Sequence, residues 1–323
     1  MKDLWPYWQR DDFGNWALMP LSVLYCALTD IRRQLYRRGY CRVQQLPVPV
    51  IVVGNITVGG TGKTPFVAWL CAQLQSAGLR PGIVLRGYGG RNRGLLAVTP
   101  RTDPVLAGDE AVLLARRTGV PVIACRDRPR GAQGLLAEGC DVVIADDGLQ
   151  HYRLGRRVEI GVLDGRRRFG NGYCLPSGPL RERRNRWDSL DFRVTQGAPA
   201  RGEWGMRLEG TRAYALGGSE HVPVHTLKRV HAVAGIGHPG RFFAYLEHLG
   251  LQVVAHAFAD HHNYTLGDLV FDSEDPVIMT EKDAVKCERF AKAGHWYLPV
   301  TASLDPNLAQ RILARITAKE GYG

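Results

Sequence analysis

Short β-branched runs alternate with longer helical segments from residue 47 onward. The runs predict buried strands, and the longer segments, whose apolar residues recur at helical spacing, predict helices. The expected strands are 49–54, 81–87, 121–125, 141–147 and 158–164, and the expected helices are 63–78, 109–119 and 129–139. Strands that alternate with helices of this length form a parallel sheet with helices on both faces. The predicted fold class is therefore α/β, with ligands bound at the carboxyl ends of the strands.

The hydrophobic pattern changes between residues 186 and 230, where short runs are broken by glycine and polar residues. Such runs are typical of antiparallel connecting structure, and the α/β alternation resumes after them. A chain of 323 residues is long enough for two domains. The predicted divisions are an N-terminal helix and basic segment at 1–45, a first α/β domain at 46–200, a linker with short antiparallel strands at 201–228, and a smaller second α/β domain at 229–323.

The amino-terminal stretch 15–40 is apolar up to Thr29 and strongly basic after it. Its apolar part is shorter than the roughly 20 residues that a membrane-spanning helix needs, and Pro20 interrupts it. Charges that follow the apolar run are the reverse of a secretory signal. We therefore expect an uncleaved helix that lies in a membrane interface, with its arginines on anionic headgroups; the alternative is a helix packed on the protein's own core. The side chains expected to insert are Trp16, Leu18, Leu21, Leu24, Tyr25 and Leu28.

The net charge of +11 and the isoelectric point near 9.5 indicate an anionic partner, either a nucleic acid, a phospholipid surface or a phosphorylated substrate. Much of this charge is gathered in two arginine clusters, within residues 32–42 and 166–186. The seven cysteines are odd in number, widely spaced and without a Cys-x-x-Cys pair. This pattern predicts reduced thiols in a cytosolic setting, with no disulfide and no zinc site.

A glycine-rich loop, VGNITVGGTGKTP at 53–65, joins the first predicted strand to the first predicted helix. Backbone N–H groups of such a loop can approach phosphate oxygens, and the helix presents its positive end to the same anion. Lys63 would reach the β- and γ-phosphates of a nucleotide, and the Thr64 hydroxyl would hold Mg²⁺. Thr57 stands where the usual pattern has its first glycine, yet the flanking strand and helix favour a nucleotide loop over a plain glycine-rich turn. The predicted nucleotide-binding residues of the loop are Thr57, Gly59, Gly60, Thr61, Gly62, Lys63 and Thr64.

Two acidic pairs stand at the ends of predicted elements. Asp146 and Asp147 end the strand 141–147, where P-loop proteins usually carry a carboxylate for the metal; the alternative is a turn-capping pair. Asp109 and Glu110 stand at a helix amino terminus, where they could supply a base for a phosphoryl acceptor or simply cap the helix. Together with the glycine-rich loop, these pairs predict a P-loop NTPase-like, nucleotide-binding first domain.

Nine sequence blocks carry a family resemblance over most of the chain. In order they are LYRRG, PVPVIVVGNITVGGTGKTP, LRGYGGR, GDEAVLLA, VIADDGLQH, LPSGPLRE, AGIGHPGRFF, FADHHNYT and TEKDAVK. On these blocks the chain resembles the tetraacyldisaccharide 4′-kinases, which are the lipid A 4′-kinases of Gram-negative bacteria. The irregular first position of the P-loop is similar to that family's variant. His238 departs from the family pattern, in which asparagine is expected.

The resemblance implies transfer of the γ-phosphate of ATP, with Mg²⁺, to the 4′-hydroxyl of a tetraacylated glucosamine disaccharide 1-phosphate, giving lipid IVA. Asp109 would be the base, assisted by His261 from the second domain, with His262 as the alternative partner. Asp146 and Asp147 would hold the metal together with Thr64. The resemblance also places Lys63 in catalysis, Gln150 at the nucleotide, and Arg86, Glu110, Arg181 and Glu182 at the lipid substrate.

The substrate that the resemblance implies also suggests where the protein works. A lipid with four acyl chains stays in the bilayer, so we expect a peripheral or monotopic enzyme on the anionic surface of the cytoplasmic face of the bacterial inner membrane. Closure of the second domain over the nucleotide would complete the Asp–His pair. A monomer that binds no nucleic acid is expected.

Two other functions compete with this interpretation. A nucleic-acid-binding P-loop ATPase would suit the charge of +11, but neither basic stripes with interleaved aromatic residues nor a nucleic-acid-binding module is evident. A dinucleotide-binding oxidoreductase would suit the glycines of GIGHPG at 235–240 and the acidic Asp260 that follows them. A single fingerprint of this kind is weak evidence, and a packing role for these glycines is favoured.

Overall fold

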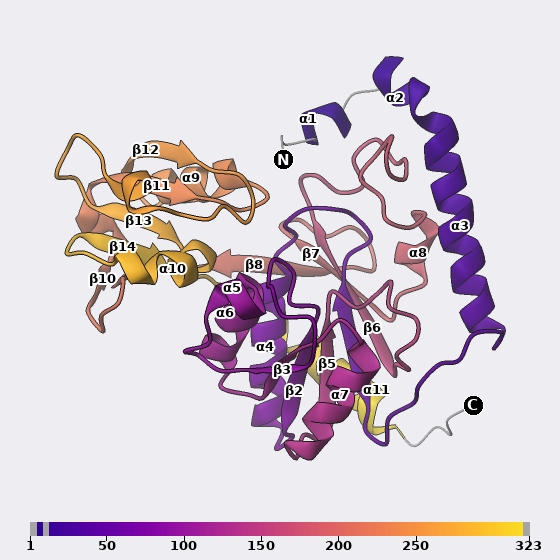
Figure 1. Cartoon of the computed structure of the whole chain (residues 1–323). Coiled ribbons are helices and arrows are strands. Elements are labelled where there is room, and N and C mark those ends of the chain that lie inside the picture. Colours follow the sequence, from indigo (N-terminus) through magenta and orange to yellow (C-terminus); the bar gives the residue numbers. More distant parts are fainter. Residues whose placement is uncertain (1–4, 9–12, 319–323) are drawn as a thin grey trace.

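The computed structural model describes residues 5–8 and 13–318, which are built around two β-sheets (Figure 1). The larger sheet has nine strands in the order β15-β8-β7-β6-β1-β5-β2-β4-β3. In the described part of this sheet, all neighbours from β8 to β4 are parallel, and only the edge strands β3 and β15 pair antiparallel. The predicted α/β class with a mostly parallel sheet is confirmed. The strands are β1 (Val50–Gly54), β2 (Pro81–Leu85), β3 (Leu96–Val98), β4 (Val122–Ala124), β5 (Val142–Asp146), β6 (Val158–Asp164), β7 (Phe192–Gln196), β8 (Trp204–Glu209) and β15 (Thr301–Leu304).

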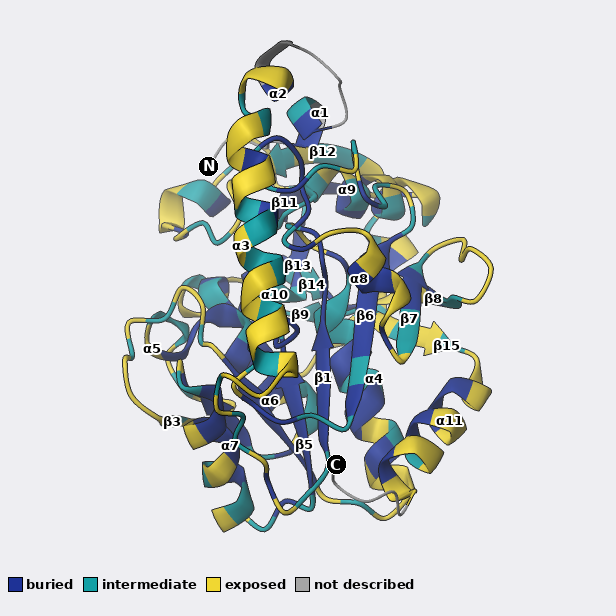
Figure 2. Ribbon diagram, turned by 90° about the vertical axis from the view of Figure 1, so that its right-hand side faces the viewer, coloured by how far each residue is buried: buried dark blue, intermediate teal, exposed yellow. Residues whose placement is uncertain are grey.

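Helices cover both faces of this sheet, so its central strands are buried on both sides (Figure 2). Ile51 and Val53 of β1 face a core shared with α4, α6 and α11, whereas Val50 and Val52 face the opposite core with α7 and α8. Strands buried in this way consist of continuous apolar runs, which explains why the sequence pattern found them. The helices of this first domain are α4 (Lys63–Ser76), α5 (Pro104–Ala107), α6 (Asp109–Thr118), α7 (Arg128–Ala137), α8 (Asn185–Asp188) and α11 (Pro306–Thr317).

The second domain is built on a six-stranded sheet in the order β10-β9-β14-β13-β11-β12. Helix α9 packs its phenylalanines on one face, and α10 packs on the other together with η2. The elements are β9 (Arg212–Ala215), β10 (His221–Pro223), η1 (Val224–Leu227), β11 (Arg229–Ala234), α9 (Pro239–His248), β12 (Gln252–Ala257), η2 (Leu266–Leu269), β13 (Val277–Thr280), α10 (Glu281–Cys287), η3 (Glu288–Phe290) and β14 (His295–Leu298).

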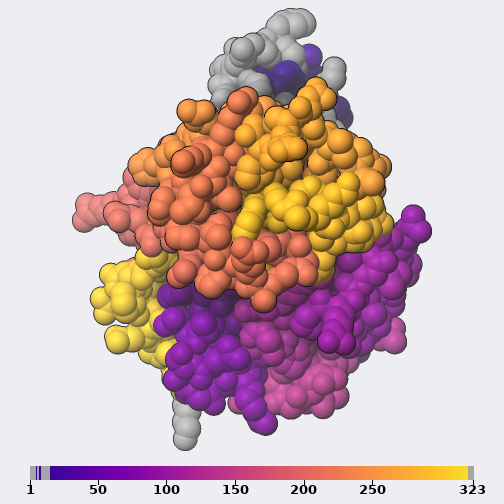
Figure 3. Space-filling view, turned by 90° about the vertical axis from the view of Figure 1, so that its left-hand side faces the viewer, coloured from indigo at the N-terminus to yellow at the C-terminus, as the bar shows by residue number. Residues whose placement is uncertain are grey.

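The predicted domain boundaries are wrong at three places. Residues 212–223 were expected in the linker, but β9 and β10 pair inside the six-stranded sheet of the second domain. Residues 204–209 were expected in a linker, but β8 pairs with β7 inside the larger sheet. Residues 301–317 were expected in the second domain, but β15 pairs with β8, and α11 packs in the core of the first domain (Figure 3). The two strands are short and amphipathic, and their pairing joins segments about 90 residues apart, which sequence patterns do not register.

Helix α3 (Met19–Arg37) lies along the outside of the first domain (Figure 1). Its inner face is fixed to the domain by buried Ser22, whose Oγ donates to the Cys174 carbonyl at 2.7 Å. Two short helices, α1 (Trp5–Trp8) and α2 (Phe13–Ala17), precede α3 in the N-terminal segment. Within residues 5–8 and 13–318, no helix combines the length and the apolar character that crossing a membrane requires.

The outer face of α3 presents a row of apolar side chains to solvent; Figure 2 shows much of this helix in the colour of exposed residues. The row consists of Leu21, Leu24, Leu28, Ile31 and Leu35, each at least 40% exposed. Of the other side chains expected to insert into a membrane, Trp16 is exposed, whereas Leu18 and Tyr25 are partly buried. The inner face of this helix therefore packs on the protein, as the second alternative expected, and the outer face is open to solvent.

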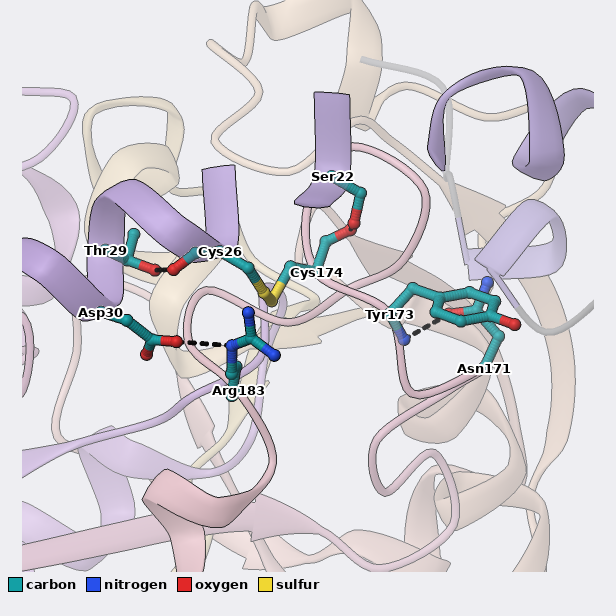
Figure 4. Close-up of a disulfide and its surroundings, with 8 residues drawn as sticks. All are labelled: Ser22, Cys26, Thr29, Asp30, Asn171, Tyr173, Cys174 and Arg183. Atoms are coloured by element: carbon teal, nitrogen blue, oxygen red, sulfur yellow. Dashed lines mark hydrogen bonds and ion pairs between the residues drawn. A yellow bond between two sulfur atoms is a disulfide. The ribbon is translucent and has the colours of Figure 1, made fainter. Parts of the chain in front are cut away.

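A disulfide joins Cys26 of α3 to Cys174 in the segment between β6 and α8 (Figure 4). The prediction of reduced cysteines without a disulfide was therefore wrong for this pair. The packing of α3 brings the two Cα atoms to 6.2 Å although 148 residues separate them in sequence, and no spacing rule reveals such a contact. The free cysteines are Cys41, Cys71, Cys125, Cys140 and Cys287.

Helix α11 provides a test of the corrected boundary. Replacing Ile312, which is fully buried in the first-domain core, with alanine should lower the free energy of unfolding by about 2–5 kcal/mol because it leaves a cavity. The same change at the neighbouring, partly buried Leu313 should cost clearly less. Denaturant unfolding of the full chain measures both, and equal, small losses would argue against the placement of α11.

Candidate active site

A cleft of about 1800 Å³ separates the two domains and is lined by residues of both. Figure 3 shows the second domain, mostly in orange, resting on the first domain, in purple and magenta with its C-terminal part in bright yellow. The predicted site residues that line this cleft are Gly59, Gly60, Thr61, Gly62, Lys63, Thr64, Arg86, Glu110, Asp146, Asp147, Gln150, Arg181 and His261. Thr57, Asp109 and Glu182 lie beneath its surface and are buried. One cleft therefore gathers residues from six separate sequence blocks.

The glycine-rich loop leaves β1 and leads directly into α4, whose first residue is Lys63. Gly59 and Gly62 adopt φ values of 100° and 84°, which only glycine takes without strain. Since α4 starts at this point, its positive end faces the cleft. The loop therefore has the form of an anion site, with the Lys63 ammonium 3.5 Å from Asp147 Oδ1.

Asp146 and Asp147 follow each other at the end of β5, yet their environments are opposite. Burial, and then the negative charge of Glu110, raise the pKa of Asp146 to about 7. Burial also acts on Asp147, but Lys63 and Arg181 outweigh it and lower the pKa of that carboxyl. Arg181 donates to both oxygens of Asp147, at 3.0 and 3.1 Å. Oδ1 of Asp146 has no hydrogen-bond partner among the described residues.

Asp109 begins α6 in the first domain and meets a histidine of the second domain. Its Oδ2 lies 3.0 Å from His261 Nδ1, and its Oδ1 accepts from the Glu110 N–H at 2.9 Å. The adjacent His262 instead lies 3.3 Å from Asp268. Of the two histidines that the sequence offered, His261 is the one beside Asp109.

This Asp–His contact shifts the pKa of both groups. Burial would raise the pKa of Asp109, but the hydrogen bond to His261 and the nearby Lys282 and Lys286 lower it to about 2. The Asp109 hydrogen bond raises the pKa of His261, against burial and Lys282. The pair therefore favours an ionised carboxylate beside an imidazole that holds its proton more tightly than usual.

The predicted lipid contact Glu182 lies below the cleft rather than in it. Its carboxylate accepts from Gln150 Nε2 at 2.7 Å and from the Tyr152 hydroxyl, so both oxygens are engaged. Gln150 itself lines the cleft and also donates to the Asn55 carbonyl at 3.2 Å. Glu182 thus accepts a hydrogen bond from Gln150 beneath the cleft. Arg181 and Arg86, in contrast, line the cleft.

Two cleft residues were missed by the sequence reasoning. Arg128 is buried and donates to the Asp146 carbonyl at 2.8 Å, and its Nη1 has no partner in the described part of the chain. Lys282, at the start of α10, lies 3.3 Å from Glu110 and 3.4 Å from Asp260. Both follow the carboxyl end of a strand closely, as the P-loop and the Asp146–Asp147 pair do, and that position was the available signal.

One glycine of GIGHPG, Gly237, serves close packing between the domains. A Cβ on Gly237 would lie 3.0 Å from the Gly60 nitrogen of the P-loop, so a side chain would not fit there. In the following helix, Arg241 reaches across to Asp164 at 2.5 Å and to Gln196 at 2.7 Å. These contacts hold the second domain directly over the P-loop, and they account for Gly237 without a dinucleotide.

The Asp109–His261 contact gives a direct titration test. In Asp109→Asn the carboxylate that stabilises the imidazolium is lost, while burial and Lys282 still oppose protonation, so the pKa of His261 should fall below its ordinary value of 6.5. NMR titration of the histidine ring protons measures this change. An unchanged pKa of His261 would contradict the contact.

Comparisons with known proteins agree with one another. The family model described as tetraacyldisaccharide-1-P 4′-kinase matches residues 14–317. The tetraacyldisaccharide 4′-kinase of Alkalilimnicola ehrlichii is 51% identical, over 98% of this chain and 97% of the relative, and that of Aromatoleum aromaticum is 50% identical, over 96% of each. The crystal structure of LpxK from Aquifex aeolicus in complex with ATP superposes with a TM-score of 0.80 at 30% identity, covering 94% of this chain and 100% of that chain.

Proposed function

The chain belongs to the tetraacyldisaccharide-1-P 4′-kinase family, and from this membership we propose which of its residues carry out the family's reaction. It is a kinase that uses ATP to phosphorylate the 4′-position of the lipid A precursor. The observation that supports the proposed roles is that the P-loop of the first domain and His261 of the second line one cleft, and that Asp109 lies directly beneath it in contact with His261. The donor and the acceptor of the phosphoryl group can therefore meet there.

Asp109 receives the proton of the sugar hydroxyl. A carboxylate with a pKa of about 2 is a weak base, but in the loose transition state of phosphoryl transfer the proton leaves late, when the acceptor oxygen has become acidic. His261 fixes the orientation of the carboxylate through its Nδ1. Positioning, rather than basicity, is the larger contribution of this pair.

Lys63 and the P-loop amides bind the β- and γ-phosphates of ATP. The ammonium already lies beside Asp147 at 3.5 Å, within a cleft that also contains Arg86 and Arg128. Positive groups fixed in position before the reaction stabilise the charge of the transferring group without reorganisation. Gln150, held by Glu182, lines the same cleft and contacts the nucleotide.

Thr64, Asp146 and Asp147 hold a Mg²⁺ ion. The donors fit a hard cation, because all are oxygens and Oδ1 of Asp146 is buried with no partner in the described structure. A cation beside Asp146 would lower its raised pKa and keep it ionised. When bound, the metal neutralises charge on the phosphates. Arg181 keeps Asp147 ionised at the same place.

The outer face of α3 lies on the anionic membrane surface at the cytoplasmic side. Its exposed row of leucines and isoleucine suits the acyl boundary, and the arginines that follow suit phosphate headgroups. Tyr25 and Arg32 of the same helix also line the active-site cleft. The helix that meets the membrane thus borders the cleft that receives the lipid, so a substrate can reach the site without leaving the bilayer completely.

Phosphoryl transfer tests the catalytic roles. With labelled ATP and the tetraacyldisaccharide 1-phosphate in mixed micelles, the wild type should transfer the label, and Lys63→Ala and Asp109→Ala should each lose roughly 10²–10⁴-fold in kcat. Asp146→Asn should need more Mg²⁺ for half-maximal rate. His261→Ala should reduce transfer, whereas the matched His262→Ala should not. A wild type that hydrolyses ATP without labelling the lipid would overturn the acceptor assignment.

Vesicle binding tests the membrane face. Leu28→Glu places a charge in the exposed apolar row, and because a leucine side chain contributes about 1.5–3 kcal/mol when removed from water, binding to anionic vesicles should weaken roughly tenfold or more. Gln34→Glu adds the same charge to an exposed position of α3 outside that row and should have a much smaller effect. Affinity for ATP should stay unchanged in both. Equal vesicle binding by the two variants would count against this face.

A further inference from the structure

Helix α10 of the second domain meets α6 of the first domain at the Asp109–His261 pair, and Lys282 lies at the centre of this contact. Its Nζ is 3.3 Å from Glu110 Oε1 and 3.4 Å from Asp260 Oδ1. The same nitrogen is 4.0 Å from Asp109 Oδ2 and 3.5 Å from His261 Nε2. Lys282 thus contacts both members of the pair and one acidic neighbour of each.

The groups around Lys282 are negatively charged, so a cation at this position is favourable. Asp109, Glu110 and Asp260 bring three carboxylates together, which would repel each other at a partly buried domain boundary. Burial alone would lower the pKa of Lys282, but these carboxylates outweigh it and raise it. The ammonium therefore stays charged and stabilises the carboxylates as anions.

The position of Lys282 is set by the fold rather than by the flexibility of its side chain. It is the second residue of α10, which starts directly at the end of β13 with Thr280 as its cap. The neighbouring Glu281 pairs with Arg117 of α6 at 3.3 Å, which docks the start of α10 on the first domain. Only 17% of the Lys282 side chain is exposed.

We propose that Lys282 is a positioning residue of the reaction, which holds His261 against Asp109 across the domain boundary. The inference rests on the proposed roles of Asp109 and His261. Lys286 also lies near Asp109, at 3.9 Å, but its closer ion pair is with Asp283, at 2.9 Å. Lys282 therefore links the placement of the second domain to the geometry of the base.

The test compares three variants of the full chain. Lys282→Met removes the cation at similar length, and Lys282→Arg keeps it. The matched control Arg116→Met removes another cation between the same two domains, from an ion pair with Glu288 at 2.6 Å that does not touch Asp109. Transfer to the tetraacyldisaccharide 1-phosphate gives kcat and the KM for ATP, and NMR titration gives the pKa of His261.

In Lys282→Met we expect kcat to fall roughly 10- to 100-fold with a nearly unchanged KM for ATP, because the reacting groups are misplaced. Lys282 lowers the pKa of both His261 and Asp109, so its loss should raise both and move the acid limb of the pH–rate profile to higher pH. Lys282→Arg should retain most of kcat and a His261 pKa close to that of the wild type. Arg116→Met should leave kcat and the His261 pKa unchanged.

Three results would overturn the inference. A loss of kcat in Lys282→Met with an unmoved His261 pKa would mean that Lys282 does not act through the pair. A large rise in the KM for ATP with kcat retained would make Lys282 a nucleotide contact. If Lys282→Met transferred phosphate at the wild-type rate, Lys282 would have no role in the reaction. A wild type that transfers no phosphate would instead overturn the proposed function, and this inference with it.

Discussion

The buried parallel pairing of β1 with β5 is the constraint on which the site depends. Val53 of β1 lies opposite Asp146 of β5, so the strand that leads into the P-loop ends beside the acidic pair. Both strands are buried on both faces, and a shift of register would turn apolar side chains away from one core and leave a void in the other. The distance between phosphate loop and carboxylates is therefore set by core packing, with no direct contact required between them.

The second domain is inserted between two adjacent strands of the first. The chain leaves the large sheet after β8 and returns in β15, whose Thr301 pairs with Glu209 at the exit. Both crossings lie side by side, so the domain is held on a single two-stranded stem. Arg241 with Asp164, and Arg117 with Glu281, secure it over the cleft. A histidine from this domain can in this way face an aspartate from the first at 3.0 Å.

The three carboxyl groups at the cleft differ in the direction of their pKa shifts. Asp146 and Asp109 are buried, and Asp147 is partly exposed. The pKa of Asp146 rises, whereas the pKa values of Asp147 and Asp109 fall. The difference comes from their partners. Lys63 and Arg181 lower the pKa of Asp147, and the hydrogen bond to His261 and the charge of Lys282 lower that of Asp109, whereas Glu110 adds to the effect of burial on Asp146. A buried carboxylate without such a partner stays ready for a proton or a metal ion, whereas one with a partner is held as an anion.

The sequence by itself determined the α/β class, the P-loop and the acidic residues at strand ends, because each depends on local patterns of apolar, glycine and charged residues. It did not reveal that β8 and β15 share a sheet, that Cys26 meets Cys174, that Glu182 is buried under Gln150, or that Lys282 reaches Asp109. Nor did it decide between His261 and His262. The backbone conformation at this turn distinguishes them, since His261 takes a φ of 61° and its ring contacts Asp109. These features join residues that are distant in the chain, so only the packed tertiary structure, in which both partners are placed at once, could decide them.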